Sequence, residues 1–224
     1  MRLTKHAHAC VRIEHGGTTV VTDPGMFSTP ADVDGVDAVL ITHEHPDHYL
    51  ADLLKHTDAP IYTIDAVAKA IHGDAPEVSE RVTVVEPDER WGIGEISVVA
   101  VGELHAVIHE DLPRFHNSGY LMTLGDITVY HPGDALTVPE HRVHLHEEQD
   151  KVDVLLAPVC APWMRISEGI DFAREIGARH NVAIHDRVYS EMGLGVVDAQ
   201  FGRLLEASGQ DFVRLGDGED LPDS

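Results

Sequence analysis

Cysteine is scarce in this 224-residue chain, which contains only Cys10 and Cys160. Two cysteines are too few for the disulfide framework of a small secreted domain. Both lie between apolar neighbours, so we interpret them as small buried hydrophobic side chains. A metal-ligand or redox role for either cysteine is the alternative interpretation.

Long hydrophobic runs are also missing. No apolar stretch reaches the roughly 18 residues that a membrane-spanning helix requires, and residues 1–6 lack the apolar core of a secretory signal. We therefore expect a cytoplasmic protein without a membrane partner. With 43% hydrophobic residues, the chain is large enough and apolar enough for one packed domain.

Basic residues are few as well: 16 Lys and Arg stand against 39 Asp and Glu, which gives a formal net charge of -23. Such a surface repels phosphate backbones, so the sequence argues against general nucleic-acid binding. An anionic substrate is not excluded, because a bound dication dominates the field in its own pocket. We expect a small-molecule substrate, and the sequence leaves open whether the chain forms a homo-oligomer.

Hydrophobic periodicity predicts an α/β protein. Alternation and turn signals predict hairpins over residues 10–22 and 118–130. Further strands are predicted over residues 36–42, 60–64, 81–85, 96–101, 153–157, 181–184 and 212–215, and helices over 65–71, 167–178 and 196–207, with helical spacing at 49–54. This order favours two mixed sheets face to face with helices outside. We expect one domain over residues 1–216 and a loose acidic tail over residues 217–224.

Histidine is abundant, with 17 residues, and one cluster is dense: His43-Glu44-His45-Pro46-Asp47-His48. At a strand end, side chains two residues apart share a face, so His43 and His45 point the same way. Asp47 and His48 follow closely enough to reach a second ion. Imidazoles with a carboxylate suit a hydrolytic divalent cation. The alternative is a solvated loop in which Asp47 only caps a helix.

This run, preceded by Thr42, resembles the signature loop of the metallo-β-lactamase superfamily. Residues 8–14 and 20–24 resemble the opening hairpin of its small cytosolic hydrolase branch, which includes proteins similar to L-ascorbate-6-phosphate lactonase. The resemblance extends from about residue 6 to about residue 193. It implies the αββα sandwich of that superfamily, with outer helices, and a binuclear metal site.

Carried onto this chain, the resemblance implies that His43, His45 and a later histidine hold one ion. Asp47, His48 and a final histidine would hold the other.

The bridging carboxylate and the final histidine are implied further along the chain. Asp134 follows a strand and a Pro-Gly turn, which allows its carboxylate to enter a cleft and bridge both ions. A turn-capping role is the alternative for Asp134. His185 ends a predicted strand and is the implied final ligand, although a lone histidine there is usually structural.

The third histidine of the first ion is the least certain position. His105 comes soonest after the strand over residues 96–101, where the family places its ligand, so the resemblance favours it. His109 is the alternative ligand and could instead face the substrate as a catalytic group. His116 is interpreted as a surface residue.

Several other residues are interpreted either as supports of the site or as structural residues. Asp23 is implied to lie beneath the site and orient ligands, with a plain turn residue as the alternative. His8 is either a core histidine or a residue at the rim of the site. The histidines at 141, 144 and 146 precede an acidic stretch and are interpreted as a solvated loop. Trp163 and Met164 could form an apolar wall, with core packing as the alternative.

The predicted function is that of a metal-dependent hydrolase. A hydroxide bridged by two divalent cations would attack an ester, lactone or phosphodiester, with Asp47 holding the nucleophile and His109 or Tyr189 donating to the developing anion. Zinc is the first choice of metal on ligand type, and manganese is the alternative. The rival hypotheses are an iron-dependent redox enzyme of the same fold and a metal-binding module without turnover.

Overall fold

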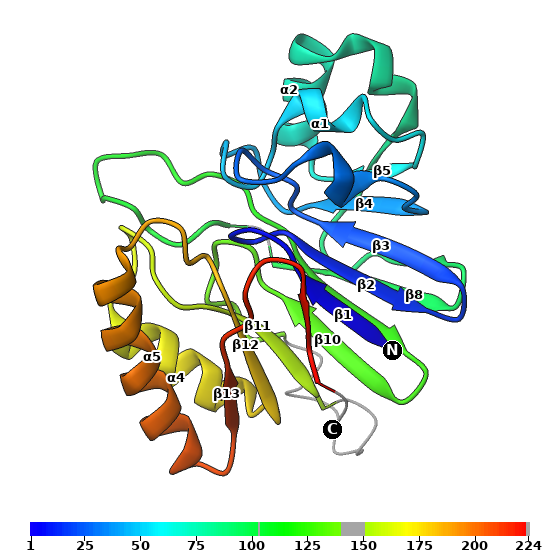
Figure 1. Ribbon diagram of the computed structural model, residues 1–224. Coiled ribbons are helices and arrows are strands. Elements are labelled where there is room, and N and C mark those ends of the chain that lie inside the picture. The colour runs from blue at the N-terminus through cyan, green and yellow to red at the C-terminus, as the bar shows by residue number, and fades with distance from the viewer. Residues whose placement is uncertain (103, 140–150, 223–224) are drawn as a thin grey trace.

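The computed structural model describes residues 1–102, 104–139 and 151–222. Residues 2–84, joined by β14 from near the C-terminus, form one seven-stranded sheet (Figure 1). Its antiparallel strands come first, and from β3 onward the pairing is parallel. In spatial order the strands are β14 (Glu219–Asp220), β1 (Arg2–Lys5), β2 (Val11–His15), β3 (Thr18–Thr22), β4 (Ala38–Ile41), β5 (Ile61–Thr63) and β6 (Val82–Val84).

Residues 90–213 form another seven-stranded sheet. Strands β7 to β10 are antiparallel neighbours, and β10 to β13 are parallel. In spatial order the strands are β13 (Asp211–Val213), β12 (His180–Ile184), β11 (Val154–Pro158), β10 (Ile127–His131), β9 (Gly119–Leu124), β8 (Ile96–Val101) and β7 (Arg90–Ile93). Both sheets are therefore mixed, as the sequence predicted.

The helices cover the outer faces of the two sheets (Figure 1). On the first sheet lie α1 (Ala51–Leu54), α2 (Asp65–Asp74) and the short 3-10 helices η1 (Pro30–Val33) and η2 (Pro76–Arg81). On the second lie α4 (Ile166–Ile176) and α5 (Glu191–Glu206). Within the described ranges, no helix combines the length and apolarity needed to cross a membrane.

Strand β4 shows why the layers form. All four of its residues are buried, since both faces of the strand are covered. Val39 and Ile41 belong to the cluster under α2. Ala38 and Leu40 belong to the core between the sheets, which also contains residues of β8, β9, β11 and β12. The αββα sandwich predicted from the resemblance is confirmed.

The local predictions were right about most elements and wrong about some bounds. The hairpins β2–β3 and β9–β10 are confirmed, and both cysteines are buried and unpaired. Helix α5 begins at Glu191, before the predicted start, because the Ser190 hydroxyl accepts a hydrogen bond from the Gly193 amide and caps the helix. The spacing at 49–54 yields only the four-residue α1.

The expectation of a loose acidic tail is wrong for residues 218–221. Glu219 and Asp220 pair with Lys5 and Thr4 of β1 as an antiparallel edge strand. Asp220 also accepts hydrogen bonds from the side chains of Arg2 and Thr4. Backbone pairing with an open sheet edge fixes a segment whose composition alone suggested mobility.

Candidate metal centre

The candidate ligands gather at one edge of the sandwich, where strands of both sheets end. His43 and His45 follow β4, and His105 follows β8. Asp134 follows β10, and His185 follows β12. The carboxyl ends of these strands lie at the same edge of the sandwich. Residues as far apart in the chain as His43 and His185 therefore both approach Asp134.

Two groups of side chains have ligand atoms that all lie within 4.8 Å of one another. Each contains three histidines and one aspartate. The groups are His43, His45, His105 and Asp134, and His8, Asp47, His48 and His185.

Asp134 joins the two groups. Its Oδ2 lies 3.3 Å from His105 Nε2 and 3.9 Å from His43 Nε2, both in the first group. Its Oδ1 lies 3.1 Å from His48 Nε2, and its Oδ2 lies 3.2 Å from His185 Nε2, both in the second group. A carboxylate placed in this way can bridge two cations.

Four of the histidines are held through Nδ1, which leaves Nε2 directed at Asp134. A hydrogen-bond acceptor at Nδ1 fixes the tautomer and keeps the Nε2 lone pair available to a cation. The acceptors are Thr42 Oγ1 for His43 (3.0 Å), Asp23 Oδ2 for His48 (2.7 Å), the Ala106 carbonyl for His105 (2.6 Å) and the Cys160 carbonyl for His185 (2.5 Å).

The facing atoms lack hydrogen-bond partners. Among the described residues, Nε2 of His48, His105 and His185 is buried without one, and so is Asp134 Oδ1. Buried polar atoms are costly unless something satisfies them. A divalent cation between imidazole nitrogens and carboxylate oxygens would do so, and the donor set is the one that zinc prefers. The residues present therefore fit a metal centre.

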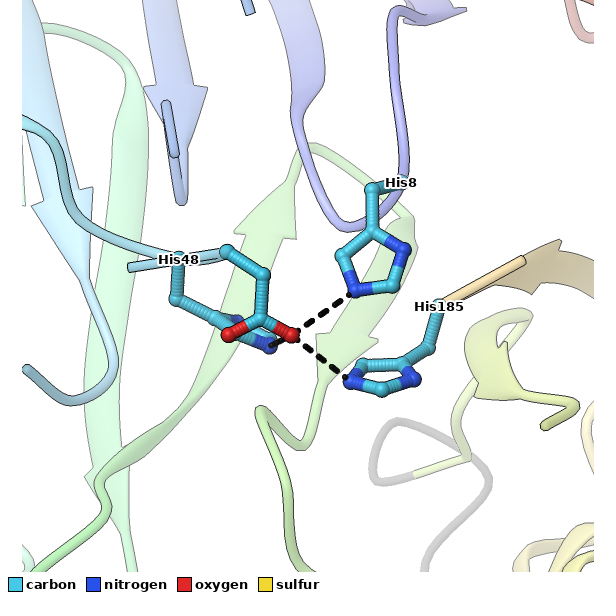
Figure 2. Close-up of side chains that lie close together, drawn as sticks. His8, His48 and His185 are labelled. Atoms are coloured by element: carbon cyan, nitrogen blue, oxygen red, sulfur yellow. Dashed lines mark hydrogen bonds and ion pairs between the residues drawn. The ribbon is translucent and has the colours of Figure 1, made fainter. Parts of the chain in front are cut away.

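In the second group, the carboxylate of Asp47 lies close to Nε2 of His8, His48 and His185. Figure 2 shows these three histidines gathered around one carboxylate. Asp47 Oδ2 lies 3.1 Å from His8 Nε2 and 3.4 Å from His185 Nε2. Burial alone would raise the pKa of Asp47, but the interactions with these two histidines hold it below its usual range. Asp47 is therefore an ionised acceptor.

Asp23 lies beneath the centre, as the resemblance implied. It is fully buried, and its Oδ1 accepts the Thr42 amide at 2.8 Å. Its Oδ2 accepts the Thr42 hydroxyl at 2.8 Å and faces His48 Nδ1 at 2.7 Å. Asp23 thus orients His48 directly, and it orients His43 through the Thr42 hydroxyl.

Backbone strain is concentrated at the centre. Of the four non-glycine residues with positive φ in the described ranges, three lie here: His8 (60°), Asp23 (44°) and His185 (58°). This region of φ is sparsely populated for L-residues, and it persists where the surroundings demand it. Glycine is needed at position 25 for a steric reason, because a Cβ there would clash with the Asp47 carbonyl oxygen.

The structure does not bring every predicted residue to the cluster. His109 is exposed, and its Nδ1 accepts a hydrogen bond from the Asp111 amide. Of the two alternatives for the third histidine, it is His105 that lies in the cluster. His116 and Tyr189 are also exposed. The predicted solvated loop with the histidines at 141, 144 and 146 lies outside the described residues.

Two residues that support Asp134 were not assigned this role from the sequence. The Trp163 indole N–H donates to Asp134 Oδ2 at 3.0 Å, and the Asn117 side chain accepts the Asp134 amide at 2.9 Å. Asn117 also donates to the Pro132 carbonyl, so it fixes the turn before Asp134. A polar residue just before a predicted strand was the only signal for Asn117.

Comparison with known protein families identifies the superfamily of this chain. The profile of a family described as the β-lactamase superfamily domain matches residues 2–185. The chain belongs to the metallo-β-lactamase superfamily. The narrower likeness to L-ascorbate-6-phosphate lactonase stays a prediction.

Several individual proteins are similar to the chain over most of its length. It is 36% identical over 223 residues to Protein Rv0786c of Mycobacterium tuberculosis, covering 96% of both chains. It is 30% identical to a UPF0173 metal-dependent hydrolase of Aeropyrum pernix, covering 70% of both. Its fold is similar to that of Igni18, a metallo hydrolase of Ignicoccus hospitalis, with a TM-score of 0.74, 18% identity, and coverage of 98% and 97%.

The electrostatics of the centre predict a pH dependence of metal binding. Burial alone would lower the pKa of His185, but Asp134 and Asp47 raise it to about 9. Below pH 9 His185 in the metal-free protein therefore carries a second proton, on Nε2, that an incoming cation must displace. We expect the apparent zinc affinity to rise between pH 6 and pH 9, with proton release on binding, as measured by calorimetry in buffers of different ionisation enthalpy. An affinity that does not change with pH would contradict this.

Proposed function

We propose that the chain is a hydrolase that uses two divalent cations bridged by Asp134. One ion would be held by His43, His45, His105 and Asp134, and the other by Asp47, His48, His185 and Asp134. The observation that carries the proposal is the set of buried, unpartnered Nε2 atoms directed at the two oxygens of one carboxylate. Two cations held there would lower the pKa of bound water toward 7 and supply hydroxide at neutral pH.

The ligand types support zinc as the first choice. Imidazole nitrogens dominate both groups, and each group includes a carboxylate. Manganese is the alternative, because carboxylate-bearing sites accept it.

Asp47 is the residue we propose to orient the attacking water. Its side chain is 24% exposed, whereas those of His48 and Asp134 are 0% and 3% exposed. Solvent therefore reaches the centre on the Asp47 side. An ionised carboxylate there accepts a hydrogen bond from water and directs its lone pair at a substrate carbonyl.

The surroundings of the centre favour an apolar substrate. Ten large hydrophobic side chains are exposed among the described residues, and nine of them belong to segments that carry or follow candidate ligands. The tenth, Val84, lines a pocket together with Leu104. Met26 donates its backbone amide to the Pro46 carbonyl, four others lie within residues 104–112 on either side of His105, and four lie within residues 188–196 after His185. The nine are Met26, Leu104, Val107, Ile108, Leu112, Val188, Tyr189, Met192 and Val196.

Aromatic rings continue this apolar surface inward. Phe115 lies 4.6 Å from the ring of His45, measured between centroids. Phe27 lies 5.0 Å from His8, and Trp163 lies 5.5 Å from His105. Apolar walls with a few placed polar groups are typical of small-molecule sites.

Two guanidinium groups on the same segments already have partners. Arg114 donates to the His105 carbonyl oxygen, and Arg187 pairs with Asp217. Phosphate recognition usually needs an arginine or lysine directed at the ligand. Among the three predicted substrate classes, we therefore propose uncharged esters or lactones with an apolar group over phosphodiesters.

Removing two ligands tests the metal-dependent function. The double variant His43→Ala/His45→Ala should lose at least one bound ion per chain, and its ester hydrolysis should fall to the background rate. Metal content is measured by elemental analysis, and rates are measured on zinc- or manganese-loaded protein. The matched control, His56→Ala/His72→Ala, removes two exposed histidines and should keep both properties. Retained hydrolysis in the His43/His45 variant, or oxygen consumption by iron-loaded protein without any hydrolysis, would contradict the proposal.

A series of aryl esters with acyl chains of increasing length tests the substrate class. We expect kcat/KM to rise with chain length, because each methylene placed on an apolar surface contributes up to about 0.8 kcal/mol, roughly fourfold. Leu112→Asp should flatten this rise, and the control Ala207→Asp, which adds the same charge at the exposed C-terminal end of α5, should preserve it. Hydrolysis that is independent of chain length, or fastest with a phosphodiester, would contradict the class while leaving the hydrolase function intact.

A further inference from the structure

His8 is a fully buried histidine whose role the metal centre alone does not define. It lies in the turn between β1 and β2, and its ring faces the carboxylate of Asp47. Figure 2 shows His8 beside His185. Its ring centroid lies 4.1 Å from that of His185 and 5.8 Å from that of His48. A histidine in this place could either ligate a cation or orient the ligand beside it.

A hydrogen bond to the ring of His8 decides between these roles, and a second one holds its backbone. The Arg187 amide donates to His8 Nδ1 at 3.2 Å, and the His185 amide donates to the His8 carbonyl oxygen at 3.1 Å. A ring nitrogen that accepts a hydrogen bond carries no proton, so the proton of the neutral ring is on Nε2. The nitrogen that lies 3.1 Å from Asp47 Oδ2 is therefore a donor. It has no lone pair to offer a cation.

We propose that His8 is a positioning residue that holds the Asp47 carboxylate through Nε2–H and does not itself bind metal. This inference rests on the proposed metal-dependent function. Asp47 Oδ2 also lies 3.4 Å from His185 Nε2 and 3.8 Å from His48 Nε2. Holding this oxygen still fixes one edge of the second ion's site and the direction in which Asp47 faces water.

The turn itself supports a functional reason for the residue. His8 has a φ of 60°, in the left-handed region where glycine is the relaxed choice. The turn is closed by a hydrogen bond from the Cys10 amide to the Ala7 carbonyl and one from the His6 amide to the Cys10 carbonyl. The chain keeps an imidazole in a conformation that a purely structural turn would fill with glycine.

The variants His8→Ala and His8→Gln separate the two roles. They place an ordinary L-residue at the same strained position, so their difference reports on the side chain. The glutamine amide reaches the region of Nε2 and donates as the imidazole does, but it is a poor ligand for zinc. Affinities for Zn²⁺ and Co²⁺ are measured by competition with a chelator, and the number of nitrogen ligands is measured from the Co²⁺ absorption spectrum.

We expect His8→Ala to bind two ions per chain, with the affinity for the weaker ion reduced by about 10- to 100-fold. His8→Gln should recover most of this loss, and the nitrogen-ligand count should be the same in all three proteins. The control is His6→Ala, in the same turn, whose ring pairs with Asp32 and which should bind metal as the unmodified chain does. Thermal unfolding of the metal-free proteins checks that each variant is folded.

Three results would overturn the proposal. A glutamine variant as weak as the alanine variant, with one nitrogen ligand lost, would make His8 a ligand. An alanine variant with unchanged affinity would remove any role in holding Asp47. A wild-type chain that binds no divalent ion would overturn both this inference and the proposed function. Metal binding without hydrolysis would contradict the proposed function alone, because the affinities are measured without substrate.

Discussion

The fold is organised around one buried carboxylate that four imidazoles face. The Nε2 atoms of His48, His185, His105 and His43 lie 3.1, 3.2, 3.3 and 3.9 Å from the oxygens of Asp134. These side chains come from strand ends in both sheets, so the sandwich must close correctly before they meet. Without a cation, Asp134 Oδ1 and the Nε2 atoms of His48, His105 and His185 lack hydrogen-bond partners, which is costly in an interior of low polarity. Metal binding and the packing of the two sheets are therefore coupled at this edge.

A second layer of residues makes this arrangement rigid. Asp23 reaches His48 directly and His43 through Thr42, while Asn117 fixes the turn that carries Asp134. Strained backbone at Asp23 and His185 is tolerated because these contacts define their positions. Around this polar interior, the neighbouring segments expose several large apolar side chains among charged ones. These apolar side chains, together with the aromatic rings beside the candidate ligands, underlie the preference we propose for uncharged, apolar substrates.

The sequence predicted those features that are local in the chain. The run from His43 to His48 could be found because its members are contiguous, and both hairpins could be found from their alternation. The choice between His105 and His109 was not decidable from spacing, since it depends on a loop that folds back until Phe115 accepts the His105 amide. The role of His8 was hidden for the same reason: its partners are 39 and 179 residues away. The edge pairing of the acidic tail likewise depends on β1, at the opposite end of the chain.

The most direct test of this account is a crystal structure of the zinc-loaded protein with anomalous scattering measured at the zinc edge. The account predicts two peaks, roughly 3.5–4 Å apart as in other two-metal sites. One Asp134 oxygen should lie within bonding distance of each ion, at about 2.0–2.2 Å. A single peak, or two peaks without Asp134 between them, would contradict the central claim.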